Sequence, residues 1–207
     1  SCQQEEKKEA EKTEPKSMED HHSYSKPDEA KVTHLDWAAE INFDKKIIKA
    51  TATYDVELSE NAEKIIFDTR DLNISQVWVD DDTLDFEMGE KDEFHGQALI
   101  IPLNADDKKV KIAYTTSKDA AALQWLEPIQ TADKTDPFLF TQSQAILART
   151  WIPCQDSPGI RFTYNAKVEV PEGLLALMSA RNPQETHPSG IYEFEMPQPI
   201  PSYLMAL

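Results

Sequence analysis

Hydrophobic and polar residues alternate along two consecutive segments of the chain, 34–43 and 48–58. In the first segment every second residue is apolar, namely Leu35, Trp37, Ala39, Ile41 and Phe43. The second segment repeats the pattern with Ile48, Ala50, Ala52, Tyr54, Val56 and Leu58. Because the side chains of a strand point alternately to its two faces, this period of two predicts half-buried strands. A polar turn at residues 44–46 joins the two segments, so we expect an antiparallel hairpin.

Shorter apolar runs follow, separated by turns that carry Asp, Gly and Pro. They predict further strands at 65–67, 72–79, 84–88, 99–103, 110–114, 162–170, 174–179, 191–196 and 200–207. No segment keeps a helical period for more than a couple of turns, and no apolar run reaches the ~18 residues that span a bilayer. Many short strands at this spacing indicate an all-β fold, an antiparallel multi-sheet sandwich or saddle.

Residues 1–28 differ in composition from the rest, because mixed charges dominate and almost nothing is apolar. Such a segment cannot offset the entropy of ordering by burial, so we expect a disordered, charged tether followed by one β-sandwich domain at 29–207. Ser1 and Cys2 resemble the end of a bacterial lipoprotein signal, in which a small residue precedes the lipidated cysteine. Cys2 is therefore a candidate lipid anchor, which implies a bacterial cell envelope; the alternative is an artificial chain start or an idle thiol.

The overall composition limits the classes of partner. The chain has 207 residues, of which 40% are hydrophobic, enough for one sizeable domain or two small ones. Its formal net charge of -17 argues against nucleic acid, whose phosphates require a basic surface. The same charge disfavours electrostatic binding to anionic lipid. Contact with a membrane is therefore expected only through the candidate anchor at Cys2.

One segment, 138–158, places polar residues inside an otherwise apolar run. Gln142, Ser143 and Gln144 carry uncharged donors and acceptors and lie between Phe140 and Ile146. Packing alone does not favour polar residues at these positions, so the segment is a candidate recognition surface rather than a reaction centre. The alternative is that the glutamines cap a sheet edge, since buried polar groups need partners in any fold.

Four ordered motifs in this chain resemble one enzyme family. They are Asp68-Thr-Arg-Asp-Leu72, Ala122-Leu-Gln-Trp-Leu126, the combination of Gln142-Ser-Gln-Ala-Ile146 with Arg149 and Pro153-Cys-Gln-Asp-Ser-Pro158, and Ala176-Leu-Met-Ser-Ala180. Together they cover roughly residues 32–207. A single short match is weak evidence, whereas several in the right order are specific. The chain resembles the amino-terminal domain of leukotriene-hydrolase-type zinc aminopeptidases.

The resemblance implies a function for the 142–145 segment. In the family this segment forms part of the substrate pocket at a domain boundary and holds the amino end of a peptide. It thus implies substrate contacts by Gln142, Ser143, Gln144 and Ala145, with Gln144 as the main recognition residue. Many relatives have glutamate where Gln144 stands, so the amide dipole of glutamine replaces a full negative charge here. Relatives have cysteine where Ser143 stands.

The catalytic motifs of that family are missing from this sequence. There is no H-E-x-x-H for zinc and no G-x-M-E-N, and the histidines are scattered at 21, 22, 34, 95 and 187. We therefore expect a fragment, truncated before the zinc domain, that binds no metal and is inactive alone. The complete enzyme would use zinc, and the missing catalytic domain and a peptide substrate would be its partners. The rival hypothesis is a tethered, non-catalytic β-sandwich binding module on the cell surface.

The second cysteine, Cys154, lies inside the Pro-Cys-Gln-Asp motif. Two cysteines provide neither a disulfide framework nor a zinc site. No histidine nearby in the sequence could activate the thiol as a nucleophile. We therefore expect Cys154 to be a small buried hydrophobic residue.

Overall fold

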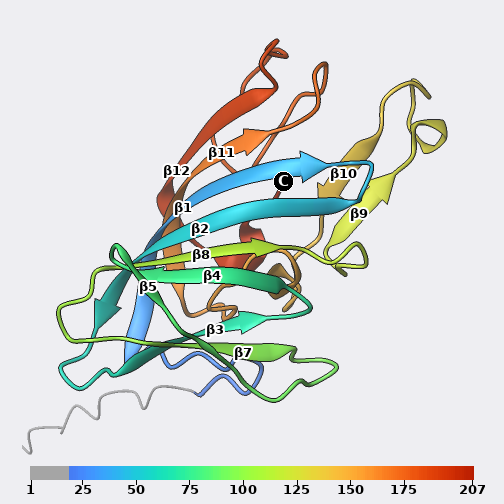
Figure 1. Ribbon diagram of the computed structural model, residues 1–207. Coiled ribbons are helices and arrows are strands. Elements are labelled where there is room, and N and C mark those ends of the chain that lie inside the picture. The colour runs from blue at the N-terminus through green and yellow to red at the C-terminus, as the bar shows by residue number, and fades with distance from the viewer. Residues whose placement is uncertain (1–18) are drawn as a thin grey trace, which may run out of the picture.

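The computed structural model describes residues 19–207, and Cys2 lies outside this part (Figure 1). The described chain is almost entirely β. Its strands are β1 (Ala30–Asn42), β2 (Ile47–Leu58), β3 (Lys64–Thr69), β4 (Asn73–Val79), β5 (Asp82–Leu84), β6 (Glu87–Met88), β7 (Gln97–Pro102), β8 (Lys109–Thr115), β9 (Leu123–Leu126), β10 (Phe138–Thr141), β11 (Arg161–Glu169) and β12 (Ile191–Pro201). Three short 3-10 turns complete it: η1 (Pro128–Gln130), η2 (Ala148–Thr150) and η3 (Ser202–Leu204). Within 19–207 no helix is long and apolar enough to cross a membrane.

The strands form three sheets. The largest has seven strands in the order β12-β11-β1-β2-β8-β4-β5, and only its β1–β11 pair is parallel. A three-stranded sheet, β3-β7-β6, lies beneath one end of it, and β9 and β10 form a separate two-stranded ribbon (Figure 1). The expectation of an all-β fold with several mostly antiparallel sheets is confirmed.

The predicted hairpin is the centre of the large sheet. β1 and β2 pair antiparallel, with Leu35 opposite Tyr54 and Trp37 opposite Ala52. The alternating apolar residues of both strands are buried on one face, while their polar neighbours face solvent. The period of two in the sequence therefore translated directly into burial, because one face of the sheet packs against the core and the other does not.

The core lies between the large sheet and the β3–β7 sheet. Tyr54 on β2 contacts Phe67 on β3 with ring centroids 5.0 Å apart, and Trp37 meets Trp151 edge-on at 5.4 Å. The polar atoms of these aromatic residues are satisfied: Trp37 Nε1 donates to the Tyr114 hydroxyl (2.8 Å), which donates to the Trp151 carbonyl (2.8 Å). Large aromatic side chains thus fill the core without leaving these donors unpaired.

Three of the predicted strands are wrong. Residues 84–88 do not form one strand, because β5 ends at Leu84 in the large sheet and β6 covers only Glu87–Met88 in the three-stranded sheet. Residues 174–179 form no strand, although they alternate between buried and exposed side chains. At the C-terminal end, β12 runs only to Pro201 and the chain then enters η3 before residues 205–207. Pro197, Pro199 and Pro201 limit pairing along this strand, because proline lacks the N–H that a ladder needs. The short strands β9 and β10 were not predicted at all.

The tether boundary at residue 28 also needs correction for residues 19–28. Ser23 Oγ donates to Asp68 Oδ2 (2.5 Å) and the Tyr24 amide donates to Asp68 Oδ1 (2.7 Å). The carbonyl of His22 accepts from Arg149 Nη2 (2.7 Å). Ser25 is itself buried. Composition suggested a solvated tether here, but these few polar residues find partners inside the domain, so the ordered body starts before β1.

Arg149 is fully buried and connects distant parts of the chain. Its Nε donates to Asp156 Oδ2 (3.0 Å), its Nη1 to the His95 carbonyl (2.7 Å) and its Nη2 to the His22 carbonyl. Gly96, with φ +81, allows the turn before β7 to lie directly against Thr69. A Cβ at this position would collide with the Thr69 carbonyl.

Asp68 and Asp156 complete this buried network. Asp68 Oδ2 accepts from the Asp156 amide (2.8 Å) and lies 3.9 Å from Arg149 Nη2. Asp156 Oδ1 accepts from Ser202 Oγ (2.6 Å). Burial raises the pKa of Asp68 above its ordinary value, while Arg149 and the hydrogen bonds to its carboxylate oppose that rise. One cation therefore serves two buried carboxylates.

Replacing Arg149 by methionine should destabilise the domain by about 3–5 kcal/mol, because both buried carboxylates lose their counter-charge. The measurement is the free energy of unfolding in urea. The loss should shrink as the pH falls from neutral, since a carboxyl with a raised folded-state pKa costs stability only as it ionises. Arg161→Met is the control: Arg161 is exposed on β11 and should change stability by no more than about 0.5 kcal/mol. Equal stability of the two variants would contradict a central role for Arg149.

Cys154 is buried in the core, as expected, and is a free thiol. Burial raises the pKa of this thiol well above its ordinary value, and the nearby Asp156 and Asp68 act in the same direction. The backbone of Cys154 forms an isolated bridge to Asp68, with Asp68 N donating to the Cys154 carbonyl (2.7 Å). The residue therefore packs as a small hydrophobic side chain.

In a Cys2→Ser background, Cys154 should not react with a thiol reagent while the protein is folded, because it is both inaccessible and protonated. One equivalent should react after denaturation. The measurement is thiol titration with a chromogenic disulfide with and without denaturant. Rapid labelling of the native protein would show that the thiol is exposed in solution.

Candidate functional site

The 142–145 segment follows directly from strand β10 of the ribbon. β10 pairs with β9, with Phe140 opposite Gln124, and the Gln142 amide continues the contact by donating to the Ala122 carbonyl (2.8 Å). At its other end the ribbon is held beside the β1–β2 turn, where Phe43 meets Trp125 edge-on at 5.2 Å. The ribbon thus fixes the direction in which the segment leaves the sheet.

Ser143 anchors the segment to the core. Its side chain is buried, accepts from Trp151 Nε1 (3.0 Å) and donates to the Met205 carbonyl (3.3 Å). Its carbonyl accepts from the Leu147 amide (2.8 Å), which closes a turn leading into η2. The side chain of Ser143 therefore points into the domain and is not presented to solvent as the sequence had led us to expect.

Gln142, Gln144 and Ala145 are exposed on either side of this anchor. Within residues 19–207 no hydrogen bond from the side-chain amide of Gln142 or Gln144 is found, and the peptide bond between Gln144 and Ala145 is cis. Each amide offers an acceptor oxygen and two donor hydrogens. The structure therefore brings the four predicted residues together as a firmly held backbone that presents two free amides.

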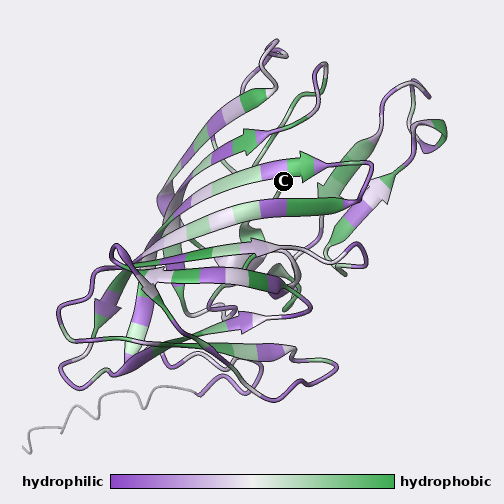
Figure 2. Ribbon diagram, viewed as in Figure 1, coloured by the Kyte–Doolittle hydropathy of each residue, from purple (hydrophilic) through white to green (hydrophobic). Residues whose placement is uncertain are grey.

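An apolar groove begins on the same ribbon. It encloses about 880 Å³ between β10 and the irregular segment 173–179. Figure 2 shows that hydrophobic residues gather on the ribbon and at the adjoining ends of β1 and β2. Four large side chains that line the groove are substantially exposed: Phe138 (53%), Phe140 (41%), Leu175 (39%) and Leu177 (48%).

This groove was missed in the sequence, although a signal for it was present. Because side chains two residues apart lie on one face of a strand, Phe138 and Phe140 share the exposed face of β10, and Gln142 follows just beyond the end of the strand. The alternation at 174–179 predicted a strand with a buried face, but in the structure Leu175 and Leu177 are the exposed members. Periodicity reports that two faces differ, not which one meets solvent.

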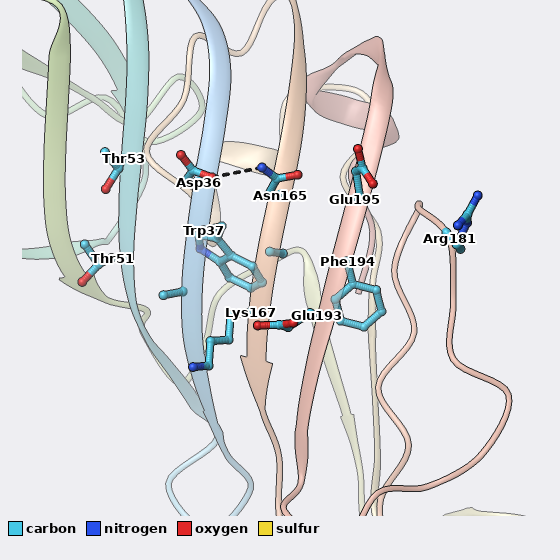
Figure 3. A pocket seen from close by; sticks show the side chains of 12 residues that line it. Asp36, Trp37, Thr51, Thr53, Asn165, Lys167, Arg181, Glu193, Phe194 and Glu195 are labelled. Carbon is cyan, nitrogen blue, oxygen red and sulfur yellow. Dashed lines mark hydrogen bonds between the residues drawn. The ribbon is translucent and has the colours of Figure 1, made fainter.

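A second depression lies on the solvent face of the large sheet and encloses about 590 Å³ (Figure 3). Here Asp36, Asn165 and Glu195 project from neighbouring strands, and Asn165 Nδ2 donates to Asp36 Oδ1 (3.3 Å). Lys167, Glu193 and Arg181 line it as well, so charges of both signs are mixed across an open surface. This arrangement offers no set of groups that converge on one point.

The described residues do not fit a metal ion. No group of three or more His, Cys, Asp or Glu side chains within 19–207 is arranged to hold one. His34, for example, is bonded to Thr163 Oγ1 (2.6 Å) on the sheet, and His95 to Asp92 Oδ1 (3.1 Å) in a turn. Both histidines are thus hydrogen-bonded within the part of the chain that the structure describes.

Comparisons with known proteins identify relatives over nearly the whole described chain. The family model "Peptidase M1 N-terminal domain" matches residues 31–204. Leukotriene A-4 hydrolase of Xenopus laevis is 37% identical over 201 residues, which are 92% of this chain and 33% of that protein. Leucine aminopeptidase 2-2 of Meyerozyma guilliermondii is 37% identical over 81% of this chain and 26% of its own length. The chain thus spans about a third of the length of these curated relatives or less.

Solved structures agree with the sequence comparison. Native yeast LTA4 hydrolase superposes with a TM-score of 0.82 at 31% identity, covering 92% of this chain and 30% of that one. The M1 zinc metallopeptidase of Deinococcus radiodurans superposes with a TM-score of 0.66 at 17% identity over 86% of this chain and 41% of that one, which shows a shared fold. With a family model that spans residues 31–204 and a common fold, the chain belongs to the family of peptidase M1 N-terminal domains.

Proposed function

We propose that this chain is the non-catalytic N-terminal domain of a zinc aminopeptidase, and that Gln142–Ala145 contact the amino end of its peptide substrate. The observation that carries the proposal is the pair of exposed, unbonded amides on a backbone fixed by buried Ser143. Relatives named leucine aminopeptidases support peptides as the substrate class. So does the Deinococcus metallopeptidase, which shares the fold and was solved with a Tyr-Ser-Ala substrate.

Gln144 suits recognition of an amine without binding it too tightly. Its amide oxygen can accept a hydrogen bond from a peptide ammonium group, and its NH₂ group can donate to a peptide carbonyl. A hydrogen bond to a charged partner contributes about 1.5–3 kcal/mol, whereas a carboxylate would add a full charge. Because the Ser143 anchor holds the backbone before the substrate arrives, little entropy is lost when this contact forms.

In this proposal the zinc chemistry of peptide cleavage belongs to another part of a longer protein, and among residues 19–207 no group of three or more His, Cys, Asp or Glu side chains is arranged to hold a metal ion. The proposed role of this domain is therefore to bind and orient the substrate while the remainder of a longer protein supplies zinc and its ligands. Acidic residues contribute as a whole, because the net charge of -17 creates a field that attracts a cationic peptide terminus. The comparisons do not favour the rival binding-module hypothesis.

Gln144→Ala in the full-length enzyme should lower kcat/KM for aminoacyl substrates by about tenfold to a hundredfold, the factor expected for one lost hydrogen bond to a charge. The free energy of unfolding should stay unchanged, because the side chain is exposed and unbonded. Steady-state kinetics and urea unfolding provide the two measurements. Gln198→Ala, which removes another exposed glutamine on β12, is the control. Wild-type kcat/KM in the Gln144 variant would remove this residue from the site.

Ser143→Ala should show a different signature, because Ser143 acts through the fold. The variant leaves Trp151 Nε1 buried without an acceptor, which should cost about 1–3 kcal/mol of stability. Ser143→Cys keeps a weak acceptor, the sulfur, opposite Trp151 Nε1 and should recover part of the lost stability. Urea unfolding of the chain measures both changes. If Ser143→Ala were as stable as wild type, the anchor described above would be unimportant.

A further inference from the structure

We infer that Phe43 and Trp125 are positioning residues for Gln142–Ala145, although neither belongs to that segment. Their contact sets the direction of the β9–β10 ribbon, and the ribbon carries the two exposed glutamines to the candidate site. The inference rests on the proposed function in one respect, namely that Gln142–Ala145 contact a substrate. It adds a requirement that lies at the β1–β2 turn, far from the segment in the sequence.

The ribbon is a separate small sheet that stands beside the β1–β2 turn (Figure 1). Its two strands pair with each other from Phe138 opposite Leu126 to Thr141 opposite Leu123. Within residues 19–207, no strand of the seven-stranded sheet pairs with either of them. Because an isolated two-stranded ribbon is only marginally stable, its direction depends on the contacts that it makes at its two ends.

Hydrogen bonds hold the inner end of the ribbon, next to the candidate site. The Gln142 amide donates to the Ala122 carbonyl (2.8 Å). Thr141 N donates to the Leu207 carbonyl (3.1 Å), and Leu207 N donates to Thr141 Oγ1 (3.0 Å). Both Thr141 and Gln142 lie within two residues of the Ser143 anchor. These bonds fix one end of the ribbon, so a contact at the other end is needed to fix its direction.

An aromatic pair provides this second contact. Phe43 directly follows β1, and Trp125 lies on β9 opposite Leu139. The two rings meet edge to face, with centroids 5.2 Å apart and an angle of 88° between their planes. Aromatic pairs favour this arrangement, because the positive edge of one ring meets the negative face of the other. The pair therefore specifies an angle between ribbon and hairpin as well as a distance.

The polar contacts at the outer end are weaker. Lys46 Nζ lies 2.7 Å from Glu127 Oε1, but the two side chains are 42% and 57% exposed, so solvent screens this ion pair. Trp125 Nε1 is buried and donates to no residue in the part of the chain that the structure describes. Ring packing rather than a hydrogen bond thus holds the indole, and a phenyl ring at this position should serve in its place.

The ladder of the ribbon connects this aromatic pair to the candidate site. Two register positions separate the Trp125–Leu139 pair from the last pair of the ladder, a distance of about 7 Å at the rise of a strand. Gln142 follows immediately after that last pair. A shift of about 1 Å at a substrate-positioning group can lower a rate by about a hundredfold. A small change in ribbon direction therefore reaches Gln142–Ala145 with a measurable effect.

The first test is amide hydrogen exchange in the full-length protein, followed by mass spectrometry of peptides that cover residues 138–142. Phe43→Ala should raise the exchange rate of the Gln142 amide about tenfold, the factor expected for one lost aromatic pair. Trp125→Phe keeps a ring and should stay close to wild type. Phe86→Ala is the matched control, because Phe86 is also partly buried against the core but lies between β5 and β6. It should leave exchange at Gln142 unchanged.

The second test is kinetic and uses a double-mutant cycle. Phe43→Ala should lower kcat/KM for aminoacyl substrates about tenfold, mainly through KM, because the positioned segment binds substrate and performs no chemistry. In a Gln144→Ala background the same substitution should lower kcat/KM by less than about twofold, since the contact that Phe43 positions is already lost. A purely structural role of Phe43 would give the same factor in both backgrounds.

Two outcomes would overturn the inference. One is an exchange rate at Gln142 that is the same in the Phe43→Ala and Phe86→Ala proteins. The other is a kinetic factor for Phe43→Ala that does not depend on Gln144. If Phe43→Ala does not fold, Phe43→Leu replaces it in both tests, because leucine keeps most of the apolar volume and loses the ring. Wild-type exchange at Gln142 in that variant would count against the inference in the same way.

The inference and the proposed function fail separately. Wild-type kcat/KM in the Gln144→Ala enzyme would reject the substrate contact, whereas the exchange rate at Gln142 would still decide whether Phe43 and Trp125 position the segment. A reduced kcat/KM in Gln144→Ala together with wild-type kinetics and exchange in Phe43→Ala would have the opposite meaning. It would retain the substrate contact and reject the positioning role.

Discussion

The buried guanidinium of Arg149 links three segments of this domain that are far apart in the chain. Arg149 reaches the segment before β1 through His22, the turn before β7 through His95 and the motif loop through Asp156. A cation without solvent is stable only if its donors are satisfied and its charge is balanced, and two buried carboxylates provide that balance. The positions of the N-terminal segment, the β3–β7 sheet and the loop at 142–158 are therefore mutually dependent.

The candidate site benefits from this rigidity. The loop that follows Gln142–Ala145 runs through the core, where Trp151 bonds to Ser143 and Gln155 Oε1 accepts from the Val32 amide (2.9 Å). Polar residues that looked like a recognition surface in the sequence thus have two tasks. Some are buried and form hydrogen bonds with other groups inside the domain. Others, chiefly Gln144, are exposed to solvent. A site built on a backbone with so many internal bonds is held in place before any ligand arrives.

The hairpin of β1 and β2 was predicted correctly because its alternation is long and one of its faces lies against a large core. The strands that were missed, β9 and β10, have four residues each and half-buried faces, so their alternation is too short to detect. Segment 174–179 alternates without being a strand: Leu174 N donates to the Pro171 carbonyl within a turn, and Ser179 N donates to the Ala206 carbonyl. Isolated bonds of this kind do not make a ladder, so alternation alone did not identify a strand.

The sequence alone determined the fold class, the central hairpin, the burial of Cys154 and the family to which the chain belongs, because each depends on local pattern or on the order of motifs along the chain. Only the tertiary structure decided which polar residues of the motif face inward. It also decided that residues 22–25 belong to the ordered body and that Phe140 and Leu177 line the same groove. These features depend on contacts between residues far apart in the chain, and a one-dimensional pattern carries no information about such pairs.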